Sequence, residues 1–397
     1  MKKTQFHLMK SSLFSLVILT LSFFIPNSFA QNVTDNQYFD LPDSPANVVE
    51  SEELNFVVQE VVSGLNRPWG MTFLPDGRML ITEKAGAIRI VENGQLLDQT
   101  LPGVPQVWNR GQGGLLDIIL HPEFEQNGWV YISYSYLEDG GSHTAVSRFK
   151  LDGYNITDLE VLFEGKPLTG RPFHFGSRMA FDDDGYLYFT IGDRGEMDRA
   201  QDLSNHSGKT FRLHDDGRIP DDNPFIDREN AMPEIYTYGN RNQQGLVIHP
   251  VTREIWSHEH GPRGGDEINI IRRGLNYGWP EITHGINYDG SEITPDTAKA
   301  GMEQPLHHWT PSIAPSGMAI IYGERYPEWD GDVMSGTLRP MFLNRSVIDL
   351  ENERVTHEER LLEGIGRVRD VRLAPDGFLY VMEESNGTIV RLIPVRY

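Results

Sequence analysis

Short runs of hydrophobic residues, each bounded by Gly, Pro, Asn or Asp, follow one another along the chain after Leu54. Within these runs hydrophobic and polar positions alternate, which predicts strands with one buried face. No amphipathic helical period continues beyond a turn or two. We therefore expect an all-β protein.

One unit recurs along this pattern: a hydrophobic strand, a turn rich in Pro, Asp and Gly, and a second hydrophobic strand. Its six copies are Met71–Glu83, Asp117–Tyr134, Arg178–Asp193, Gly245–Glu259, Gly317–Gly336 and Val371–Glu384. A spacing of about 45 to 70 residues is typical of propeller blades with loops inserted between their strands. The repeat therefore indicates a β-propeller.

The segment before the first copy, Asn55–Leu65, has the pattern of a strand that completes the last blade. Such a strand would close the ring and remove exposed sheet edges. We predict one six-bladed β-propeller over residues 52–397, with its site on the loop-bearing face at the central channel. Two β-sandwich domains are the alternative, but no linker-like change of composition divides the chain.

The first 30 residues have a basic start, the apolar run Leu13–Ile25 and the small-residue ending Ser28–Ala30. This pattern predicts a cleaved secretory signal peptide. The apolar run is shorter than the roughly 20 residues of a spanning helix, so we expect no membrane insertion after cleavage. Residues 31–51 are polar and aperiodic, which predicts a flexible leader. The expected location is periplasmic or secreted, in a bacterium.

Charge narrows the classes of partner. The 397 residues carry a formal charge of −22, and removal of residues 1–30, with three lysines and no acid, would change it to −25. An anionic surface repels nucleic acid and anionic lipid, so neutral or cationic soluble partners are expected. Cysteine is absent. An exported domain of this size must then rely on its hydrophobic core rather than on disulfides.

Polar clusters precede the first strand of several copies, which would place them on one face of the propeller. They are Arg110–Gly114, His174–Arg178, Arg241–Gln244 and Arg367–Asp370. Guanidinium groups bind carboxylates or phosphates through paired hydrogen bonds, so Arg241, Arg367 and Arg369 predict an anion site. The alternative is that each arginine pairs with a nearby acid, for example Arg369 with Asp370.

His174 is the histidine of these upstream clusters. An imidazole titrates near neutral pH, which suits removal of a proton from an alcohol. A structural histidine is the alternative, because spacing alone does not distinguish the two.

The segment HEHGPRGGDEIN at residues 258–269 first resembles a zinc site, but no third ligand follows His258 and His260 at the usual interval. Its turn glycines and the acids Asp266 and Glu267 better suit a hard cation such as calcium. A structured turn without metal is the alternative.

Four motifs together resemble the soluble pyrroloquinoline quinone (PQQ)-dependent aldose sugar dehydrogenases of the glucose/sorbosone dehydrogenase family. They are GQGGLL at residues 111–116, GNRNQQG at 239–245, HGPRGGDEIN at 260–269 with NYGWP at 276–280, and RVRD at 367–370. The similarity covers Asn55–Pro394, and the motifs follow the family's order. The resemblance implies a six-bladed propeller that binds a quinone with three carboxylates.

The resemblance also implies roles for individual residues. The residues that match the quinone-binding residues of the family are Arg241, Asn242 and Gln244. Of these, Arg241 would lie near the reactive carbonyl of the quinone. Arg367 and Arg369 would hold the carboxylates of the cofactor. Calcium would be bound by the cofactor and by the backbone carbonyls of Gly261 and Pro262. His174 would be the catalytic base and Gln112 a substrate contact.

Two positions depart from the family pattern. Where better known members have a lysine that contacts the cofactor, this chain has Arg339, and a planar guanidinium does not replace an ammonium ion in geometry. Phe173 stands where some members have a sugar-binding acid. Selectivity for glucose is therefore not expected from the family pattern.

The implied reaction is oxidation of the anomeric hydroxyl of an aldose to a lactone, with hydride transfer to the quinone and electrons passing to an external acceptor. Two alternatives remain: a calcium-dependent lactonase, which would bind its metal through carboxylates and asparagines, and a propeller that only binds a ligand.

Overall fold

The computed structural model describes residues 48–395. These residues belong to a compact unit that begins at Asn47. The predicted signal peptide and most of the predicted leader lie outside the described residues. Within the described part, no helix is long and apolar enough to cross a membrane.

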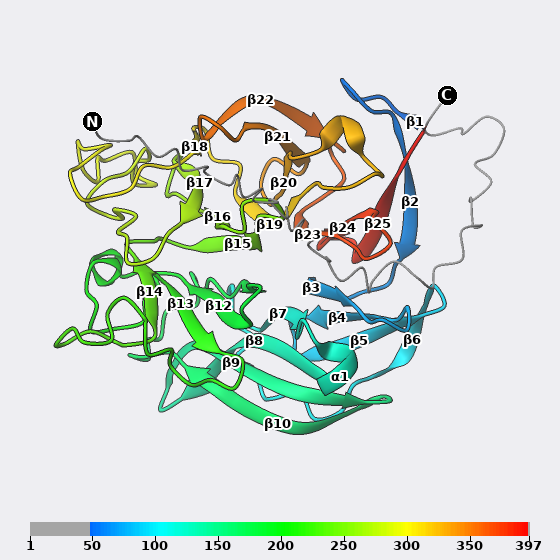
Figure 1. The fold of residues 1–397 in the computed structure, drawn as a ribbon, viewed down its shortest axis with the longest axis horizontal. Coiled ribbons are helices and arrows are strands. Elements are labelled where there is room, and N and C mark those ends of the chain that lie inside the picture. Colours follow the sequence, from blue (N-terminus) through cyan, green and yellow to red (C-terminus); the bar gives the residue numbers. More distant parts are fainter. Residues whose placement is uncertain (1–47, 396–397) are drawn as a thin grey trace, which may run out of the picture. The chain divides into compact units, whose positions relative to one another are not determined.

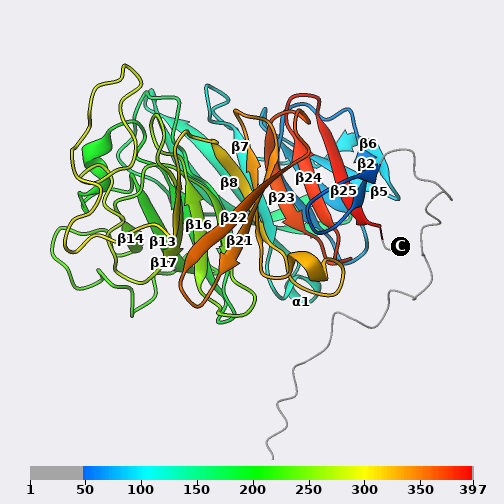
Figure 2. The same ribbon diagram turned by 90° about the horizontal axis from the view of Figure 1, so that it is seen from above.

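Six antiparallel sheets surround a common centre, so the predicted all-β, six-bladed propeller is confirmed (Figures 1 and 2). Each sheet has one strand at the centre and its other strands farther out. The central strands are β3 (Pro68–Phe73), β7 (Leu115–Leu120), β11 (Met179–Phe181), β15 (Gln243–Ile248), β19 (Pro315–Ile320) and β23 (Val368–Leu373).

The remaining strands complete the sheets in chain order. The first three sheets contain β4 (Met79–Glu83), β5 (Ala87–Glu92) and β6 (Gln95–Thr100); β8 (Trp129–Glu138), β9 (Gly141–Asp152) and β10 (Asn155–Glu164); and β12 (Tyr186–Ile191), β13 (Lys209–His214) and β14 (Ile235–Tyr238). The last three contain β16 (Ile255–Glu259), β17 (Asp266–Ile271) and β18 (His307–Trp309); β20 (Val333–Thr337), β21 (Leu343–Asp349) and β22 (Arg354–Leu361); and β24 (Leu379–Glu383), β25 (Thr388–Pro394), β2 (Phe56–Val62) and β1 (Val48–Val49).

The six sequence repeats are the six inner hairpins. Each repeat forms the central strand of a sheet and the strand beside it, for example β3 with β4 and β23 with β24. The helical elements are short and lie in turns or loops: α1 (Phe124–Asn127) and two 3-10 helices, Met197–Ala200 and Pro327–Trp329. The prediction that helix is nearly absent is therefore confirmed for the described residues.

Ring closure takes place in the last sheet. Strand β2 lies within Asn55–Leu65 and pairs with β25 from the C-terminal end, as the sequence predicted. The two-residue strand β1 then pairs with β2. Val48–Val49 belong to the segment predicted as a flexible leader, and in the structure these two residues form a strand. The open edge of β2 supplies the backbone partners that order this segment.

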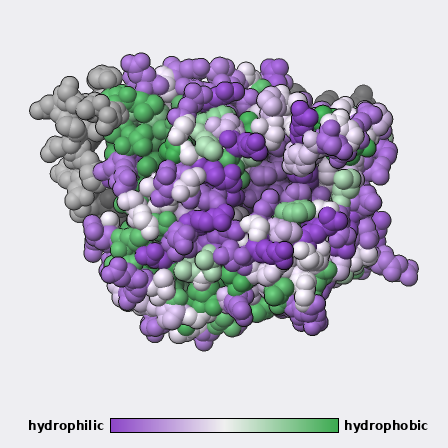
Figure 3. Space-filling view, turned by 180° about the vertical axis from the view of Figure 1, so that it is seen from behind, coloured by the Kyte–Doolittle hydropathy of each residue, from purple (hydrophilic) through white to green (hydrophobic). Residues whose placement is uncertain are grey.

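The hydrophobic core is divided among the spaces between neighbouring sheets. Side chains of adjacent blades form a cluster in each of the six spaces. Trp329 and Trp256, for example, are fully buried between sheets. Figure 3 shows mainly polar residues over one face, with hydrophobic residues in separate patches. Alternation along the strands thus directs one half of each strand's side chains into these clusters.

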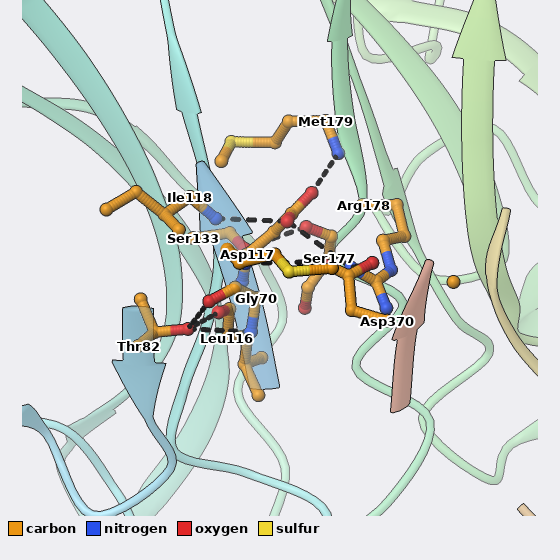
Figure 4. Close-up of polar contacts among 12 residues, drawn as sticks. Gly70, Thr82, Leu116, Asp117, Ile118, Ser133, Ser177, Arg178, Met179 and Asp370 are labelled. Carbon is orange, nitrogen blue, oxygen red and sulfur yellow. Dashed lines mark hydrogen bonds and ion pairs between the residues drawn. The ribbon is translucent and has the colours of Figure 1, made fainter. Parts of the chain in front are cut away.

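A network of buried charges joins the central strands (Figure 4). The Arg178 guanidinium lies 2.9 Å from Asp370 Oδ1 and 3.3 Å from Asp117 Oδ1. Arg372 contacts the same two carboxylates, at 3.0 and 2.6 Å. Arg178 also donates to the backbone carbonyls of Gln244 and Arg369. Its side chain is 2% exposed, so one residue connects the second, third, fourth and sixth blades in a site without water access.

We predict that Arg178→Met lowers the apparent free energy of unfolding by about 3–5 kcal/mol, because it leaves buried carboxylates short of a partner. Arg253→Met is the matched control, since Arg253 forms an exposed ion pair with Asp183, and such pairs contribute about 0–1 kcal/mol. Denaturant-induced unfolding of both variants measures the difference. Equal losses would contradict a special role for the central network.

Candidate functional site

A cavity lies at the centre of the propeller where the polar loops meet. The central cavity is lined by residues of four kinds. Its apolar floor consists of Trp69, Leu116, Phe175 and Leu338; its amide groups belong to Gln112, Asn242 and Gln244; its charged groups are Arg67, Lys84, Arg367, Arg369 and Glu384; and His260, Gly111 and Gly176 complete it. Five residues predicted for the site are among them: Gln112, Asn242, Gln244, Arg367 and Arg369.

Positive charge predominates in the central cavity. Arg369 Nη2 lies 2.7 Å from Glu384 Oε2, and Arg367 and Arg67 contact the same glutamate at 3.5 and 3.4 Å. Burial raises the pKa of Glu384, but Arg369, followed by Arg367 and Arg67, outweighs this effect and lowers the pKa to about 2. With Lys84, the cavity lining contains four cationic side chains and one carboxylate. The excess of three positive charges favours a ligand with several negative charges.

Arg369 does pair with an acid, as the alternative expected, but Asp370 as its partner is wrong. Its partner is Glu384 on the adjacent strand end and not Asp370, which binds Arg178 and Arg372 in the central network. The reason is the pleat: successive side chains of a strand point to opposite faces, so Arg369 and Asp370 diverge.

The amide side chains hold the loop that carries His174. Asn242 Oδ1 accepts a hydrogen bond from Gly176 N at 3.1 Å, and Gln244 Nε2 donates to Gly176 O at 3.0 Å. Gln112 Oε1 accepts from His174 N at 2.7 Å. The backbone of His174 has a φ of 57°, a left-handed conformation that is strained for a residue with a side chain. Three blades therefore fix the position of one histidine.

His174, which is partly exposed, pairs with the buried Asp193. The distance from His174 Nδ1 to Asp193 Oδ1 is 2.6 Å, and Asp193 also accepts hydrogen bonds from Gly195 N and from Trp279 Nε1. Because a carboxylate accepts and does not donate, Nδ1 carries the imidazole proton. Nε2 is then free to accept a proton from a ligand.

Electrostatics keep this imidazole neutral. Burial lowers the pKa of His174, and the charge of Arg241 lowers it further, against the raising effect of Asp193. Burial raises the pKa of Asp193, but the hydrogen bond with His174 outweighs this effect and holds the pKa below its ordinary value. At neutral pH the pair therefore consists of a neutral imidazole and a carboxylate, the arrangement of a general base.

A second, smaller cavity adjoins the first through His260. The side cavity is lined by Arg241, Glu259, Gly261, Glu267 and Trp279, among others. Arg241 Nη1 donates to Gly261 O at 2.7 Å and to His260 O at 3.0 Å, and its guanidinium lies over the Trp279 ring. The predicted quinone contact and a predicted calcium ligand are thus direct neighbours.

The turn at Gly261 is fixed from one side by Asp266. Its carboxylate accepts hydrogen bonds from Gly261 N, Ser312 Oγ, Ile313 N and Ala314 N. A Cβ on Gly261 would lie 2.2 Å from Gly265 O, so only glycine fits. Asp266 therefore shapes the turn and has little capacity left for a metal. Pro262 follows in the same turn and is buried.

Two carboxyl groups face each other across the strands beside this turn. Glu259 pairs in register with Glu267 on β17. Glu259 accepts hydrogen bonds from Asn240 Nδ2 and from the backbone N–H of Arg241 and of Asn242. Burial, followed by the charge of Glu259, raises the pKa of Glu267 to about 8. Glu259 thus positions the Arg241–Asn242 backbone.

The histidines of the HEHGPRGG segment have other partners. His258 Nε2 lies 3.0 Å from Gly317 O, and His260 Nε2 lies 2.8 Å from Pro315 O, both on β19. Among the described residues, no group of three or more His, Asp or Glu side chains is placed to hold a metal. Both imidazoles connect the fourth blade to the fifth.

Besides Gly261 and Pro262 of the turn, three predicted residues lie outside the lining of the central cavity. His174 is next to it, through Gln112, and Arg241 lines the side cavity. Arg339 is exposed, and its neighbour Leu338 lines the central cavity instead. Phe173 lies beside the His174 ring at 5.1 Å between centroids, which gives the imidazole an aromatic neighbour.

Asp193, Glu384, Arg67 and Lys84 are site residues that sequence reasoning missed. A signal for the two acids was present, because four of the six repeats end in an acidic residue: Glu83, Asp193, Glu259 and Glu384. Antiparallel pairing returns the end of the second strand to the start of the first, so each acid must lie beside the polar cluster of its own blade. The contact of Asp193 Oδ1 with His174 Nδ1 and the backbone bond from Glu384 N to Arg367 O show the result.

Comparisons with known proteins agree with this geometry. The family model described as glucose/sorbosone dehydrogenase matches residues 65–391. Aldose sugar dehydrogenase YliI of Escherichia coli strain K12 is 43% identical over 345 residues, which cover 85% of this chain and 92% of that protein.

Solved structures show the same relationship. The soluble aldose sugar dehydrogenase from Escherichia coli in its apo-form is 40% identical, with a TM-score of 0.83 over 86% of this chain and 100% of that one. The PQQ-bound form of aldose sugar dehydrogenase from Streptomyces coelicolor is 29% identical, with a TM-score of 0.71 over 86% of this chain and 98% of that one. The chain belongs to the glucose/sorbosone dehydrogenase family.

Proposed function

We propose that the chain is a PQQ- and calcium-dependent aldose sugar dehydrogenase, which oxidises the anomeric hydroxyl of an aldose to the lactone and passes electrons to an external acceptor. The family supports an oxidoreductase acting on aldoses. The charge of the central cavity carries the proposal for the cofactor.

The residues of the central cavity fit a flat anion. An excess of three positive charges, on Arg67, Lys84, Arg367 and Arg369 against Glu384, matches a cofactor with three carboxylates. The apolar floor of Trp69, Leu116 and Phe175 suits a planar ring system. When bound, the quinone supplies an acceptor for a hydride and its two electrons.

The chain's own residues supply the proton chemistry. His174 Nε2 accepts the proton of the anomeric hydroxyl while the hydride leaves the anomeric carbon. Asp193 then stabilises the imidazolium through the 2.6 Å contact at Nδ1. Arg241 would hold an oxygen that gains negative charge, because its guanidinium is buried beside the side cavity. Gln112 binds the substrate beside His174 in this proposal.

For calcium, the backbone carbonyls of Gly261 and Pro262 are the proposed ligands. The Asp266 hydrogen bonds hold this turn rigid. Gly261 O accepts one bond from Arg241, and a carbonyl oxygen has two lone pairs. A cation at this turn would therefore lie beside the quinone contact Arg241.

Export to the periplasm or the medium is proposed from the sequence of residues 1–30 alone. An exported dehydrogenase would work outside the cytoplasmic nicotinamide pool, and a cofactor held in the protein suits that place. The sugar substrate and the acceptor are its expected partners.

Two other functions fit the structure less well. A calcium-dependent lactonase would need a metal held by side chains at the channel, whereas this cavity is lined by cations. A propeller that only binds ligands would not need a His174–Asp193 pair fixed by three blades.

The central test adds PQQ and calcium to the purified protein and follows bleaching of an artificial electron acceptor with a panel of aldoses. We expect turnover that depends on the quinone and is lost when a chelator removes calcium. Hydrolysis of an aldonolactone, measured in parallel, tests the lactonase. Absence of aldose oxidation by protein that has bound the quinone would contradict the proposal.

We expect His174→Ala to keep quinone binding and to lower the single-turnover rate of hydride transfer about 10²- to 10⁴-fold, because a general base contributes that factor. His357→Ala is the control, since His357 is an exposed residue of β22. An unchanged single-turnover rate in His174→Ala would remove His174 as the base.

The pH dependence tests Asp193. The reaction needs neutral His174, so the rate should rise with pH through the lowered pKa of this histidine and level off above it. Asp193 raises that pKa, so in Asp193→Asn the rise should move to lower pH. The plateau rate should fall on the order of 10²-fold or more, because the proton at Nδ1 is no longer fixed.

Asp158→Asn, which changes an exposed carboxylate of β10, should leave the whole profile unchanged. A plateau rate in Asp193→Asn equal to that of the unmodified protein would show that Asp193 does not act on the base. A rise displaced to higher pH would contradict the stated electrostatic effect.

A further inference from the structure

Lys84 is a buried cation of the central cavity that no family motif assigned. It follows β4 in the first blade and is 6% exposed. Its backbone is fixed between two neighbours, because Lys84 N donates to Arg67 O at 3.1 Å and Lys84 O accepts from Leu115 N at 3.0 Å. A Cβ on Gly114 would lie 2.2 Å from Lys84 O, so the first and second blades are in close contact here.

The ammonium group has a hydrogen-bond donor to spare. Lys84 Nζ donates to Gly111 O at 2.7 Å and to Asn109 Oδ1 at 3.2 Å. Both are uncharged acceptors, and an ammonium ion has three N–H groups. Within residues 48–395, no ion pair to Lys84 is formed. One N–H and the full charge of a buried side chain therefore remain for a ligand.

The surroundings of Lys84 are themselves positive. Burial lowers the pKa of Lys84, and Arg67 and Arg369 lower it further against the effect of Glu384. A folded chain does not gain stability by gathering like charges around a buried lysine. Such a cluster is stabilised when an anion binds it, and the cluster opens into the central cavity.

Arg339 is in a different position. Arg339 is exposed in the loop that follows strand β20. Leu338, and not Arg339, lines the central cavity. The carbonyl of Leu338 accepts a hydrogen bond from Arg367 Nη1 at 2.9 Å, which orients Leu338 and Arg367 toward each other. Lys84 is therefore better placed than Arg339 for the cofactor contact that the sequence suggested for Arg339.

We propose that Lys84, supported by Arg67, binds a carboxylate of the anionic cofactor in place of Arg339. This inference rests on the proposed function. It assigns the first blade a part in cofactor binding: Lys84 contributes a buried ammonium ion and Arg67 an exposed guanidinium at the rim, and Arg367 and Arg369 contribute guanidinium groups from the adjoining sixth blade.

The test measures equilibrium binding of PQQ, with calcium present, through quenching of tryptophan fluorescence, since Trp69 lines the cavity. The same titration with the trimethyl ester of PQQ removes the carboxylate charges. We expect Lys84→Gln to weaken binding of the tricarboxylate on the order of tenfold or more, the usual value of a charge-assisted hydrogen bond. Binding of the triester should change little.

Three variants serve as controls. Lys84→Arg keeps the charge and should retain most of the affinity for the tricarboxylate. Lys150→Gln changes an exposed lysine of β9 and Arg339→Gln changes the residue of the sequence-based hypothesis, and neither should weaken binding. Thermal unfolding of each ligand-free variant checks the fold, and Lys84→Met replaces Lys84→Gln if the latter does not fold.

The outcomes separate this inference from the proposed function. Equal losses for tricarboxylate and triester in Lys84→Gln, or a larger loss in Arg339→Gln, would overturn the assignment to Lys84 and leave the dehydrogenase proposal standing. Quinone binding that depends on Lys84, without oxidation of any aldose, would support the assignment and overturn the activity. A protein that binds neither ligand would overturn both.

Discussion

The buried network around Arg178 is the constraint that the central part of the propeller depends on. Two arginines and two aspartates from three blades satisfy one another without water, and Arg178 adds hydrogen bonds to backbone carbonyls of two blades. Taking such charges out of water costs several kcal/mol for each ion, and only well-formed pairs offset that cost. The network therefore requires the central strands to hold one register relative to one another.

That register places the site. Asp370 in the network follows Arg369 in the cavity, so opposite faces of one strand belong to the charged network and to the cavity lining. Arg178 lies at 4.2 Å from the Trp69 ring, which is part of the cavity floor. The floor of the cavity thus rests on the charged network, and the polar loops above it are extensions of the strands that the network aligns.

The groups that form the candidate site come from several blades. His174 is held through backbone and side-chain contacts with Gln112, Asn242 and Asp193, and the cations come from the first and the sixth blade. No single blade has a complete set of binding groups. A closed ring can meet this requirement because it brings loops that are far apart in sequence to one axis, and it leaves each loop free to differ from the others.

Sequence by itself determined the six repeats, the closing strand Asn55–Leu65 and the polar clusters before the central strands, because alternation and turn residues are local properties. It also placed Gln112, Asn242, Gln244, Arg367 and Arg369 in one group. Only the tertiary structure decided which charges meet: that Arg369 binds Glu384, that His174 binds Asp193, and that Lys84 rather than Arg339 enters the cavity. Partners of this kind depend on how neighbouring blades pack, and strand periodicity contains no information about the distance between side chains of different blades.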